Sequence, residues 1–400
     1  MISFDNTEIA FRSKNKQDLQ RAYLLFKIIG WPRIVKIAKL LTPLALQMKL
    51  PIKGLIKKTI FKQFCGGETI QECDHTIESL HAFGIGTILD YSVEGKTQEH
   101  DFEQTTQIII QTIEKSATDK AIPFAVFKVT GIAQHHLIEL ESSRIRAQRK
   151  GAEFRELNND EKNRIAAILE RIDRICAAAA KHQTRLFIDA EETWIQTAID
   201  QWTYEMMLKY NTTQCIVYNT IQMYRHDRLA YLKAEFERAK TDGILYGVKL
   251  VRGAYMEKER ARAKELGYPS PIQPDKASTD KDYDAALDFI VANKDVFSVC
   301  AGTHNEKSSM YLATLLHQDQ VEPNDPKFYF AQLLGMSDHI SYNLASAGYN
   351  VAKYVPFGPV REVMPYLLRR ADENTSVAGQ TGRELSLITK EVNRRKVNRL

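Results

Sequence analysis

The chain has few cysteines and no pattern that would link them. Its 400 residues include five cysteines, an odd number, and no two of them form a CxxC pair. This argues against a disulfide framework and against a zinc knuckle as the basis of the fold. A reducing, intracellular compartment is the simpler interpretation.

The chain also lacks any run of 18 consecutive apolar residues, so the sequence predicts no membrane-spanning helix. The N-terminal segment MISFDNTEIAFRSKNKQDLQ has no apolar signal core, and its acidic residues Asp5, Glu8 and Asp18 argue against a transit peptide. The charges of the whole chain nearly balance, with 55 Lys and Arg against 50 Asp and Glu. Since no nucleic-acid-binding motif accompanies this mild excess, no nucleic-acid partner is expected.

Two further patterns are missing. Gly84 and Gly86 begin a GxGxxG-like pattern, but the third glycine is absent, which argues against a Rossmann dinucleotide site. No second histidine or carboxylate stands at metal-ligand spacing from His304, so no metal site is expected.

Eight short runs rich in β-branched and aromatic residues recur along the chain. They cover residues 87–93, 124–129, 185–190, 215–221, 246–251, 297–303, 328–334 and 350–355. Charged helical segments separate most of them, such as 160–181 and 224–240. This alternation is typical of an α/β fold of the (βα)8 TIM-barrel type. We therefore predict a barrel over residues 81–380, an all-helical N-terminal region over residues 1–80 and a basic C-terminal tail over residues 381–400.

Barrels of this type place their chemistry at the C-terminal ends of the strands. The polar residues expected there are Glu94, Lys128, Asp189, Glu191, Glu192, Asn219, Gln222, Arg252, Tyr255, Thr303, His304, Asn305, Gln332 and Tyr354. Lys128 could act as a Schiff-base nucleophile, bind a carboxylate or merely extend its charge to solvent. Asp189 could act as a base or cap the following helix. The segment VKLVRGAYMEKER, residues 248–260, offers small residues and an arginine suited to a phosphate-bearing cofactor inside the barrel mouth.

The segment KYVPFGPVREVMPYLLRR, residues 353–370, ends in two adjacent arginines. If Pro359 begins a helix, one face of that helix carries an aromatic ring, two guanidinium groups and a carboxylate. These residues are Tyr366, Arg369, Arg370 and Glu373. Paired arginines can hold a small carboxylate in a bidentate geometry. The alternative is a solvated helix end whose arginines only complement the helix dipole.

Residues 31–67 contain eight cations and no Asp or Glu. The cations are Arg33, Lys36, Lys39, Lys49, Lys53, Lys57, Lys58 and Lys62. Interleaved Ile, Leu and Phe make the region amphipathic, so it could lie on an anionic membrane surface. The alternative is a set of helices that pack on the main domain and turn a lysine-rich face outward.

Seven motifs, in chain order, resemble those of the FAD-dependent proline dehydrogenase family. They are FIDAEET, IQMYRHDRLAYL, VKLVRGAYMEKER, GTHN, FAQLLGM, KYVPFGP and PYLLRRADEN. The resemblance runs from about residue 83 to residue 378, and the N-terminal region is similar to that of the monofunctional, eukaryote-like members.

This resemblance implies a distorted (βα)8 barrel that holds FAD and oxidises L-proline to Δ1-pyrroline-5-carboxylate, the first step of proline catabolism. Electrons would pass from FAD to a membrane quinone. If the source is bacterial, the lack of a targeting signal predicts a cytoplasmic protein attached peripherally to the inner membrane, whereas a eukaryotic member would be mitochondrial.

Site residues also follow from the resemblance. Arg369 and Arg370 match two arginines that grip the proline carboxylate, with Lys128 as a third cation, and Tyr354 and Tyr366 match tyrosines that line the proline ring. Other matches are Glu373, just beyond the arginines, and Glu94, an acid that gates the site. Flavin-side positions are Asp189, which we also expect among the catalytic residues, Gln222, Lys249, Val251, Arg252, Gly253, Ala254, Tyr255, Thr303, His304, Asn305 and Gln332.

There are three rival functions. A hydroxyproline dehydrogenase would share the fold and cofactor, but the Tyr354 ring would fill the space near C4 of the substrate. A lysine-dependent aldolase would use Lys128 as a Schiff base and need no flavin. A non-catalytic membrane adaptor would rely on residues 31–67.

Overall fold

A computed structural model describes residues 2–31, 33, 35–38, 40, 42, 48, 52–93, 96–376 and 380–397, and for residues 371–376, 380 and 381 it describes the backbone alone. The chain divides into two compact units. Unit 1 comprises residues 1–94 and 331–400, and unit 2 comprises residues 95–330.

Eight strands follow one another around a closed parallel barrel, so the predicted fold class is confirmed. They are β1 Ile85–Tyr91, β2 Phe124–Lys128, β3 Arg185–Asp189, β4 Val217–Gln222, β5 Tyr246–Val251, β6 Phe297–Gly302, β7 Phe328–Leu333 and β8 Val351–Phe357. All eight predicted runs form strands, and no strand boundary lies more than two residues from its prediction.

The register of the strands in unit 2 brings their polar ends together. Lys128 pairs with Asp189 across β2 and β3, and Gln222 pairs with Val251 across β4 and β5. Side chains two residues apart share one face of a strand. The face that carries Asp189 therefore also carries Phe187, whose ring stacks 4.3 Å from that of Phe124. An aromatic layer thus lies beneath the polar ends of these strands.

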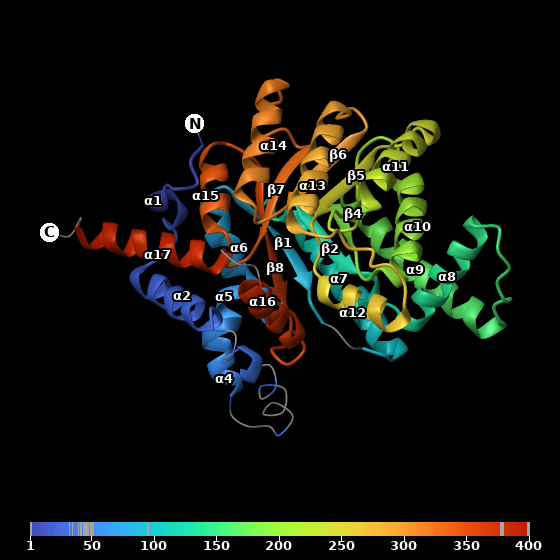
Figure 1. The fold of residues 1–400 in the computed structure, drawn as a ribbon, viewed down its shortest axis with the longest axis horizontal. Helices are drawn as coiled ribbons and strands as arrows, with labels where there is room; N and C mark the ends of the chain where they lie inside the picture. The colour runs from blue at the N-terminus through green and yellow to red at the C-terminus, as the bar shows by residue number, and fades with distance from the viewer. Residues whose placement is uncertain are drawn as a thin grey trace. The chain divides into compact units, whose positions relative to one another are not determined.

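Helices separate the strands of unit 2. Its helical elements are α7 Glu99–Thr118, η3 Val129–Gly131, α8 His135–Arg149, α9 Asn159–Lys181, α10 Thr193–Tyr210, α11 Arg228–Asp242, α12 Met256–Leu266, α13 Lys276–Ala292 and α14 Glu306–Gln318. Helix α9 starts with a capping box, in which Asn158 and Glu161 exchange side-chain to backbone hydrogen bonds of 2.9 Å. Helices α13 and α14 lie side by side (Figure 1).

Helix α11 begins later than the sequence pattern predicts, at Arg228 rather than Tyr224. The backbone N–H groups of Met223 and Tyr224 donate to Val251 O and Arg252 O, both at 2.8 Å. These two residues therefore pair with the end of β5, and Tyr224 O accepts from Gln273 N at 2.7 Å instead of from the first turn of a helix.

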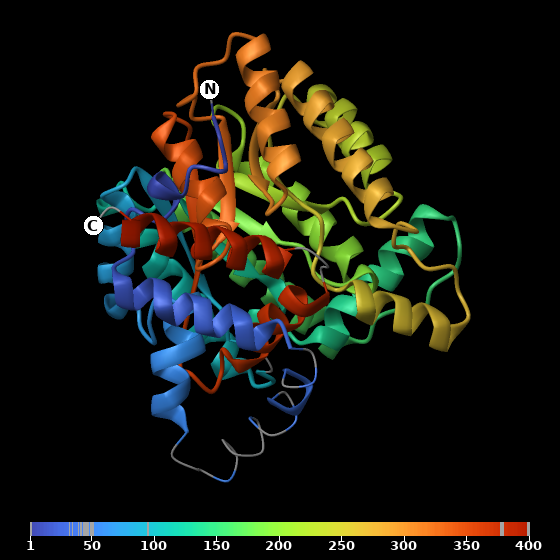
Figure 2. The same cartoon turned by 60° about the vertical axis from the view of Figure 1, so that its left-hand side comes forward.

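Unit 1 contains β1, β8 and a set of helices. The helices are α1 Thr7–Ala10, α2 Lys16–Ile29, α4 Lys53–Ile56, η1 Lys57–Phe61, α5 Lys62–Phe64, η2 Gln71–Cys73, α6 Asp74–His81, α15 Asp338–Ser346, α16 Met364–Ser376 and α17 Gln380–Val397. Helices α2 and α17 lie side by side (Figures 1 and 2). Phe26, Phe64, Leu367 and Ile388 belong to one buried apolar cluster that joins α2, α5, α16 and α17. The helical N-terminal region is therefore present as predicted.

Helix α16 begins at Met364, so the prediction that Pro359 opens it is wrong. Residues 359–363 form turns in which Glu362 N donates to Pro359 O at 2.8 Å. Pro365 occupies the first turn of the helix instead, where a missing N–H has no cost. Since Tyr366, Arg369 and Arg370 all lie inside α16, their shared face does not depend on where the helix starts.

Candidate functional site

At the C-terminal ends of three strands of unit 2, one carboxylate lies between two ammonium groups. Lys249 Nζ is 2.6 Å from Asp189 Oδ1, and Lys128 Nζ is 3.4 Å from Asp189 Oδ2. Asp189 and Lys249 are each only 7% exposed. Lys249 Nζ also lies 5.2 Å from the centre of the Phe187 ring, so an aromatic face supports the ion pair from below.

This arrangement resolves the alternatives for Asp189. The cap residue of α10 is Glu192, whose side chain makes no capping hydrogen bond, and Thr193 N at the start of this helix donates to Glu259 Oε1 at 2.6 Å. The possibility that Asp189 serves as the helix cap is therefore wrong, and its carboxylate faces the lysines instead.

Gln222, at the end of β4, presents an acceptor to the same end of the barrel strands. Its Nε2 donates to Glu191 O at 3.1 Å. Its Oε1 is buried and, within the described part of the chain, accepts no hydrogen bond. A buried amide oxygen in this state suits a ligand with an N–H or O–H edge.

Gly253, in the loop after β5, allows a close approach of the backbone. It has a φ of +132°, and a Cβ at this position would lie 2.4 Å from the ring of Tyr224. A side chain is therefore excluded here on two grounds, strain and overlap. Ala254 and Tyr255 complete this loop before α12, and Tyr255 is the cap residue of that helix.

Arg252 is held firmly by three side chains. Its guanidinium donates to Asp280 at 2.8 Å, to Thr303 at 2.6 Å and to Ser308 at 3.0 Å. It also lies 4.3 Å from the centre of the Tyr283 ring. Sequence reasoning did not find Asp280 and Ser308, because each lies inside a helical segment whose polar pattern is that of an ordinary solvated face.

The remaining flavin-side predictions fall at several strand ends. Val251 pairs with Gln222, and Asn305 caps α14 by accepting from Lys307 N at 2.9 Å and Ser308 N at 3.3 Å. His304 is half-buried in the loop between β6 and α14. In unit 1, Gln332 is buried and its Oε1 accepts from Ser341 Oγ at 2.8 Å.

Unit 1 presents a different group of side chains. The guanidinium carbon of Arg370 lies 4.9 Å from the centre of the Tyr366 ring, and both residues are buried. Arg369 is half-buried beside them, and Tyr354 on β8 is 7% exposed. Glu94 and the side chain of Glu373 lie outside the described residues.

The basic region of unit 1 differs from its prediction. Lys53 and Lys57 lie 3.0 Å and 2.8 Å from Glu68, so the expectation that these cations face no acid is wrong. The opposing carboxylate comes from just beyond residues 31–67, which is why the segment itself gave no sign of it. Lys58 and Lys62 are exposed, and the described residues include no acidic partner for either. Lys39 and Lys49 lie outside the described residues.

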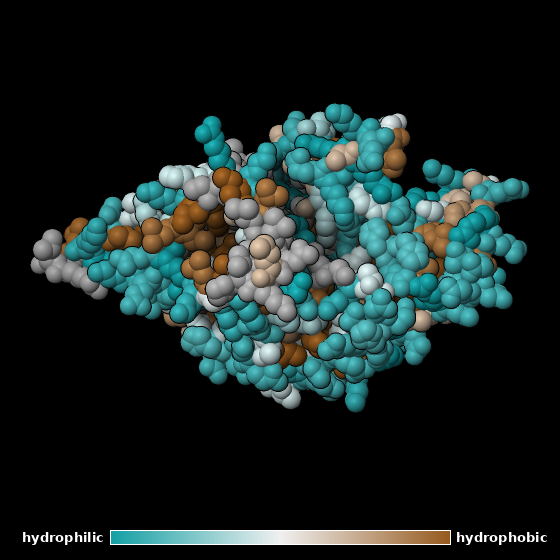
Figure 3. Space-filling view, turned by 90° about the horizontal axis from the view of Figure 1, so that it is seen from below, coloured by the Kyte–Doolittle hydropathy of each residue, from teal (hydrophilic) through white to brown (hydrophobic). Residues whose placement is uncertain are grey.

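Exposed apolar side chains occur near these lysines. Leu24 and Ile28 of α2, Trp31 and Leu55 are between 49% and 66% exposed. Figure 3 shows apolar side chains gathered in the part of unit 1 that contains α2. Among the described helices, none has the length and apolar character needed to span a bilayer, and no three described His, Cys, Asp or Glu side chains are grouped to hold a metal ion.

A closed parallel (βα)8 barrel with charged and polar side chains at its strand ends defines an enzyme of the TIM-barrel class. The sequence profile described as "Proline dehydrogenase" matches residues 73–383, and the chain belongs to this family. The family and enzyme class expected from the motifs, an oxidoreductase of the proline dehydrogenase type, are confirmed.

Individual relatives carry more than one name. "Hydroxyproline dehydrogenase" of Xenopus laevis is 31% identical over 99% of this chain and 91% of its own length. "Proline dehydrogenase 1, mitochondrial" of Dictyostelium discoideum is 32% identical over 88% of this chain and 67% of its own length. Proline utilization A of Bdellovibrio bacteriovorus has the same fold, with a TM-score of 0.72 and 18% identity, covering 92% of this chain. The present chain spans 38% of that longer protein.

Proposed function

We propose that this enzyme oxidises L-proline to Δ1-pyrroline-5-carboxylate by hydride transfer to FAD and passes the electrons to a membrane quinone. The observation that carries the proposal is the Lys128–Asp189–Lys249 group, with Asp189 and Lys249 buried, at the strand ends of a proline dehydrogenase-family barrel. The reaction is the first step of proline catabolism.

The residues of unit 2 fit an FAD group. Gln222 offers a buried acceptor, and Gly253 offers backbone that a ligand can approach closely. Arg252 is a cation already fixed in place by Asp280, suited to an anionic part of the cofactor. We also assign FAD binding to Lys249, Asp189, Val251, Ala254, Tyr255, Thr303, His304 and Asn305, and to Gln332 of unit 1. When bound, FAD supplies the electron acceptor, and the protein supplies binding, orientation and charge.

The substrate's carboxylate is assigned to cations. Arg369 and Arg370 each present a planar fork that matches a carboxylate, and Lys128 adds a third positive charge. Tyr354 and Tyr366 provide aromatic surface for the ring, and Glu373 is assigned to the same site. Cationic surroundings favour the neutral form of the proline nitrogen, whose lone pair is needed as the hydride leaves C5.

Anaerobic addition of L-proline to the FAD-loaded protein tests the proposal. We expect the yellow flavin absorbance to bleach, and 4-hydroxyproline to bleach it far less efficiently. Protein that binds no FAD and is instead trapped by borohydride with a carbonyl substrate would support the aldolase alternative. Bleaching by 4-hydroxyproline with equal or higher efficiency would make hydroxyproline the substrate. This alternative is tested because the Xenopus relative is named for that substrate.

The quinone acceptor requires the enzyme to reach a bilayer. The lysines at 58 and 62 and the exposed apolar residues Leu24, Ile28 and Trp31 are candidates for this peripheral contact. The proposed location is the cytoplasmic side of the inner membrane, or the mitochondrion in a eukaryote. The proposed division of the chain remains a helical region at 1–80, a barrel at 81–380 and a basic end at 381–400.

A further inference from the structure

Glu191 is a buried carboxylate that has no role in the function proposed above. It lies between β3 and α10 and is 3% exposed. One carboxylate oxygen accepts from Thr130 N at 3.0 Å, and the other accepts from the Thr130 hydroxyl. Thr130 lies in the turn that follows β2, two residues after Lys128. The carboxylate of Glu191 therefore fixes the backbone that carries this cation.

The backbone of Glu191 makes two more connections. Its carbonyl oxygen accepts from Gln222 Nε2 at 3.1 Å, and its N–H donates to Gln196 Oε1 at 2.7 Å. The bond to the Glu191 carbonyl fixes which way the Gln222 amide faces. Its buried Oε1 accepts no hydrogen bond within the described part of the chain. One residue thus fixes the end of β2 and the orientation of the side chain at the end of β4.

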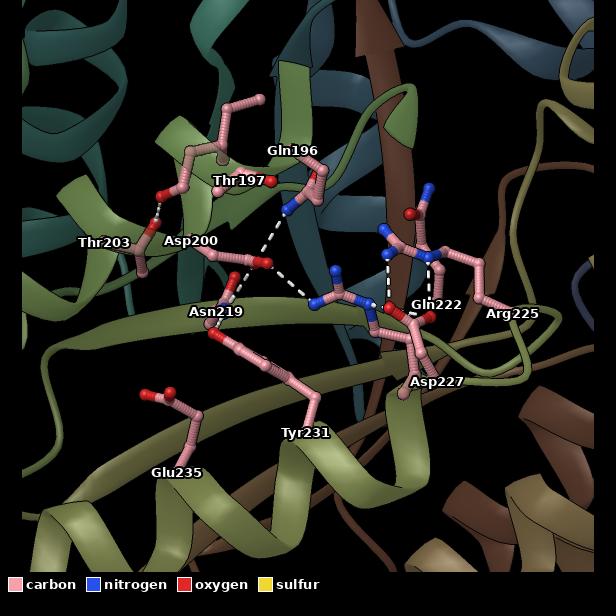
Figure 4. A network of polar contacts seen from close by, with 12 residues as sticks. Gln196, Thr197, Asp200, Thr203, Asn219, Gln222, Arg225, Asp227, Tyr231 and Glu235 are labelled. Carbon is pink, nitrogen blue, oxygen red and sulfur yellow. Dashed lines mark hydrogen bonds and ion pairs between the residues drawn. The ribbon is translucent and has the colours of Figure 1, made fainter. Parts of the chain in front are cut away.

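The connection through Gln196 leads to a buried ion pair. Gln196 Nε2 donates to Asp200 Oδ1 at 2.9 Å, and Arg228 Nη1 lies 2.7 Å from Asp200 Oδ2. Asn219 of β4 also donates to Asp200 Oδ1 at 3.1 Å. Figure 4 shows Gln196, Asp200 and Asn219 directed toward one another. This series of hydrogen bonds therefore connects Glu191 to side chains of α10, α11 and β4, which restrict its position.

The pKa of Glu191 is raised, which gives this carboxylate a further property. Burial and the adjacent Glu192 raise the pKa of Glu191 to about 7, while Thr130 and Lys128 lower it. Glu192 is itself paired with Lys258 and lies 4.0 Å from His135. Glu191 therefore changes charge near neutral pH, beside the Lys128 cation.

We propose that Glu191 is a positioning residue of the active site: its carboxylate sets the β2 turn that carries Lys128, and its carbonyl orients the Gln222 amide toward the cofactor. The inference rests on the proposed FAD-dependent function. Glu191 itself contacts neither substrate nor cofactor in this scheme.

The variant Glu191→Gln tests this role, with Glu192→Gln as a matched control. Both remove one buried carboxylate from the same segment, but only the first replaces the acceptor of the Thr130 bonds. Thr130→Val provides a milder variant that removes the hydroxyl contact alone. Hydrogen exchange of peptides covering 128–134 and 217–226, and FAD binding to the apoprotein followed by flavin fluorescence, report on structure and cofactor separately.

Glu191→Gln is expected to raise the exchange rate of the β2 turn and the FAD dissociation constant, each roughly tenfold, the effect of losing one charged hydrogen bond. Thr130→Val should shift both in the same direction by less, and Glu192→Gln should shift neither when measured well above pH 7, where Glu191 is ionised with or without the adjacent carboxylate. The parent's FAD affinity should change with a midpoint near pH 7, and this step should be missing in Glu191→Gln.

The inference is overturned if Glu191→Gln matches Glu192→Gln in both measurements. Faster exchange with unchanged FAD affinity also overturns it, because Glu191 would then support the fold without positioning the cofactor. A parent protein that binds FAD but is not bleached by proline contradicts the proposed substrate and leaves the Glu191 result intact. A parent that binds no FAD contradicts both.

Discussion

The two units hold their candidate-site cations in different ways. In unit 2, Lys128 and Lys249 share the buried carboxylate of Asp189. In unit 1, Arg370 lies against the ring of Tyr366, on a helix whose first turn packs into an apolar core. A buried carboxylate between two ammonium groups is part of the folded structure, and removing it leaves charges in a poorly solvated place. A guanidinium is a planar group whose geometry matches that of a carboxylate, which suits it to bind the substrate. Substitutions in unit 2 should therefore affect stability first, and those on α16 should affect substrate binding first.

The largest effect is expected for Asp189→Asn. This change leaves Lys128 and Lys249 beside a neutral amide, and loss of one partner from a buried ion pair costs about 3–5 kcal/mol. Urea unfolding should show this loss in the free energy of unfolding. The matched control is Asp173→Asn, whose exposed partner Lys209 lies 2.7 Å away, where about 0–1 kcal/mol is expected. Equal losses in the two variants would contradict the assignment of a buried ionic site to unit 2.

The next effect is a pH dependence. The pKa of Glu191 is raised from 4.5 to about 7 in the folded protein, so the folded state binds this proton more tightly than the unfolded chain does. The resulting stabilisation is complete below pH 4.5 and is lost as the pH rises to 7. Relative to Glu191→Gln, the parent's free energy of unfolding should fall by about 3 kcal/mol across this range. Urea unfolding of both proteins at several pH values measures the difference, and a constant difference would show that Glu191 does not titrate there.

The third prediction concerns Arg370→Lys, on α16 of unit 1. The variant keeps a positive charge but loses the bidentate fork, so the apparent affinity for proline should weaken by about 1.5–3 kcal/mol while bound flavin and stability are retained. Steady-state kinetics, flavin content and urea unfolding measure the three quantities. Arg361→Lys, in the exposed turn before α16, serves as a control. Unchanged proline kinetics, with Arg369→Lys equally silent, would remove the carboxylate role from α16.

The strands could be predicted from the sequence because each is a short β-branched and aromatic run in a chain that alternates strand with helix. The predicted first residues of helices were less accurate, because tertiary hydrogen bonds decide where a helix begins. Tyr224, two residues after β4, is hydrogen-bonded to Arg252 instead of entering α11, and Pro365 lies in the first turn of α16 in place of Pro359. A proline signals a helix start, but two prolines six residues apart leave the choice to packing around Val360 and Val363.

The same limit applies to the site. Lys128 and Asp189 could be named because they end predicted strands, but their contact depends on the register, which no local pattern fixes. Asp280 holds Arg252 from 28 residues away, and Glu191 holds Thr130 from 61 residues away. These partners carry no motif and are identified only when the chain is folded.

Tyr354→Ser gives a smaller expected effect. Tyr354 lies on β8 and is 7% exposed, so a smaller side chain would open space in unit 1 without adding a charge. We expect the preference for proline over 4-hydroxyproline to narrow by roughly tenfold, since an apolar wall discriminates only weakly against one added hydroxyl. The ratio of kcat/KM for the two substrates measures this directly. A ratio equal to that of the parent would show that Tyr354 does not select the substrate.

The smallest effect concerns the surface lysines of unit 1, where paired and unpaired cations can be compared directly. Lys53 and Lys57 are paired with Glu68, whereas Lys58 and Lys62 are exposed and have no acidic partner among the described residues. A cation near an anionic lipid surface contributes about 1 kcal/mol, and a nearby carboxylate cancels much of its field. Replacing Lys58 and Lys62 with glutamine should therefore weaken binding to anionic vesicles more than replacing Lys53 and Lys57 does.

Co-sedimentation with anionic and neutral vesicles, at low and high salt, measures this binding. Binding of the parent should be confined to anionic vesicles and fade with salt, because exposed charges are screened. Both double variants must first oxidise proline normally with a soluble dye acceptor, which shows that the barrel is intact. If the two variants bind equally well, charge pairing does not decide the contact. If both bind as the parent does, the attachment lies outside these four lysines, and the exposed apolar residues Leu24, Ile28 and Trp31 become the next positions to replace.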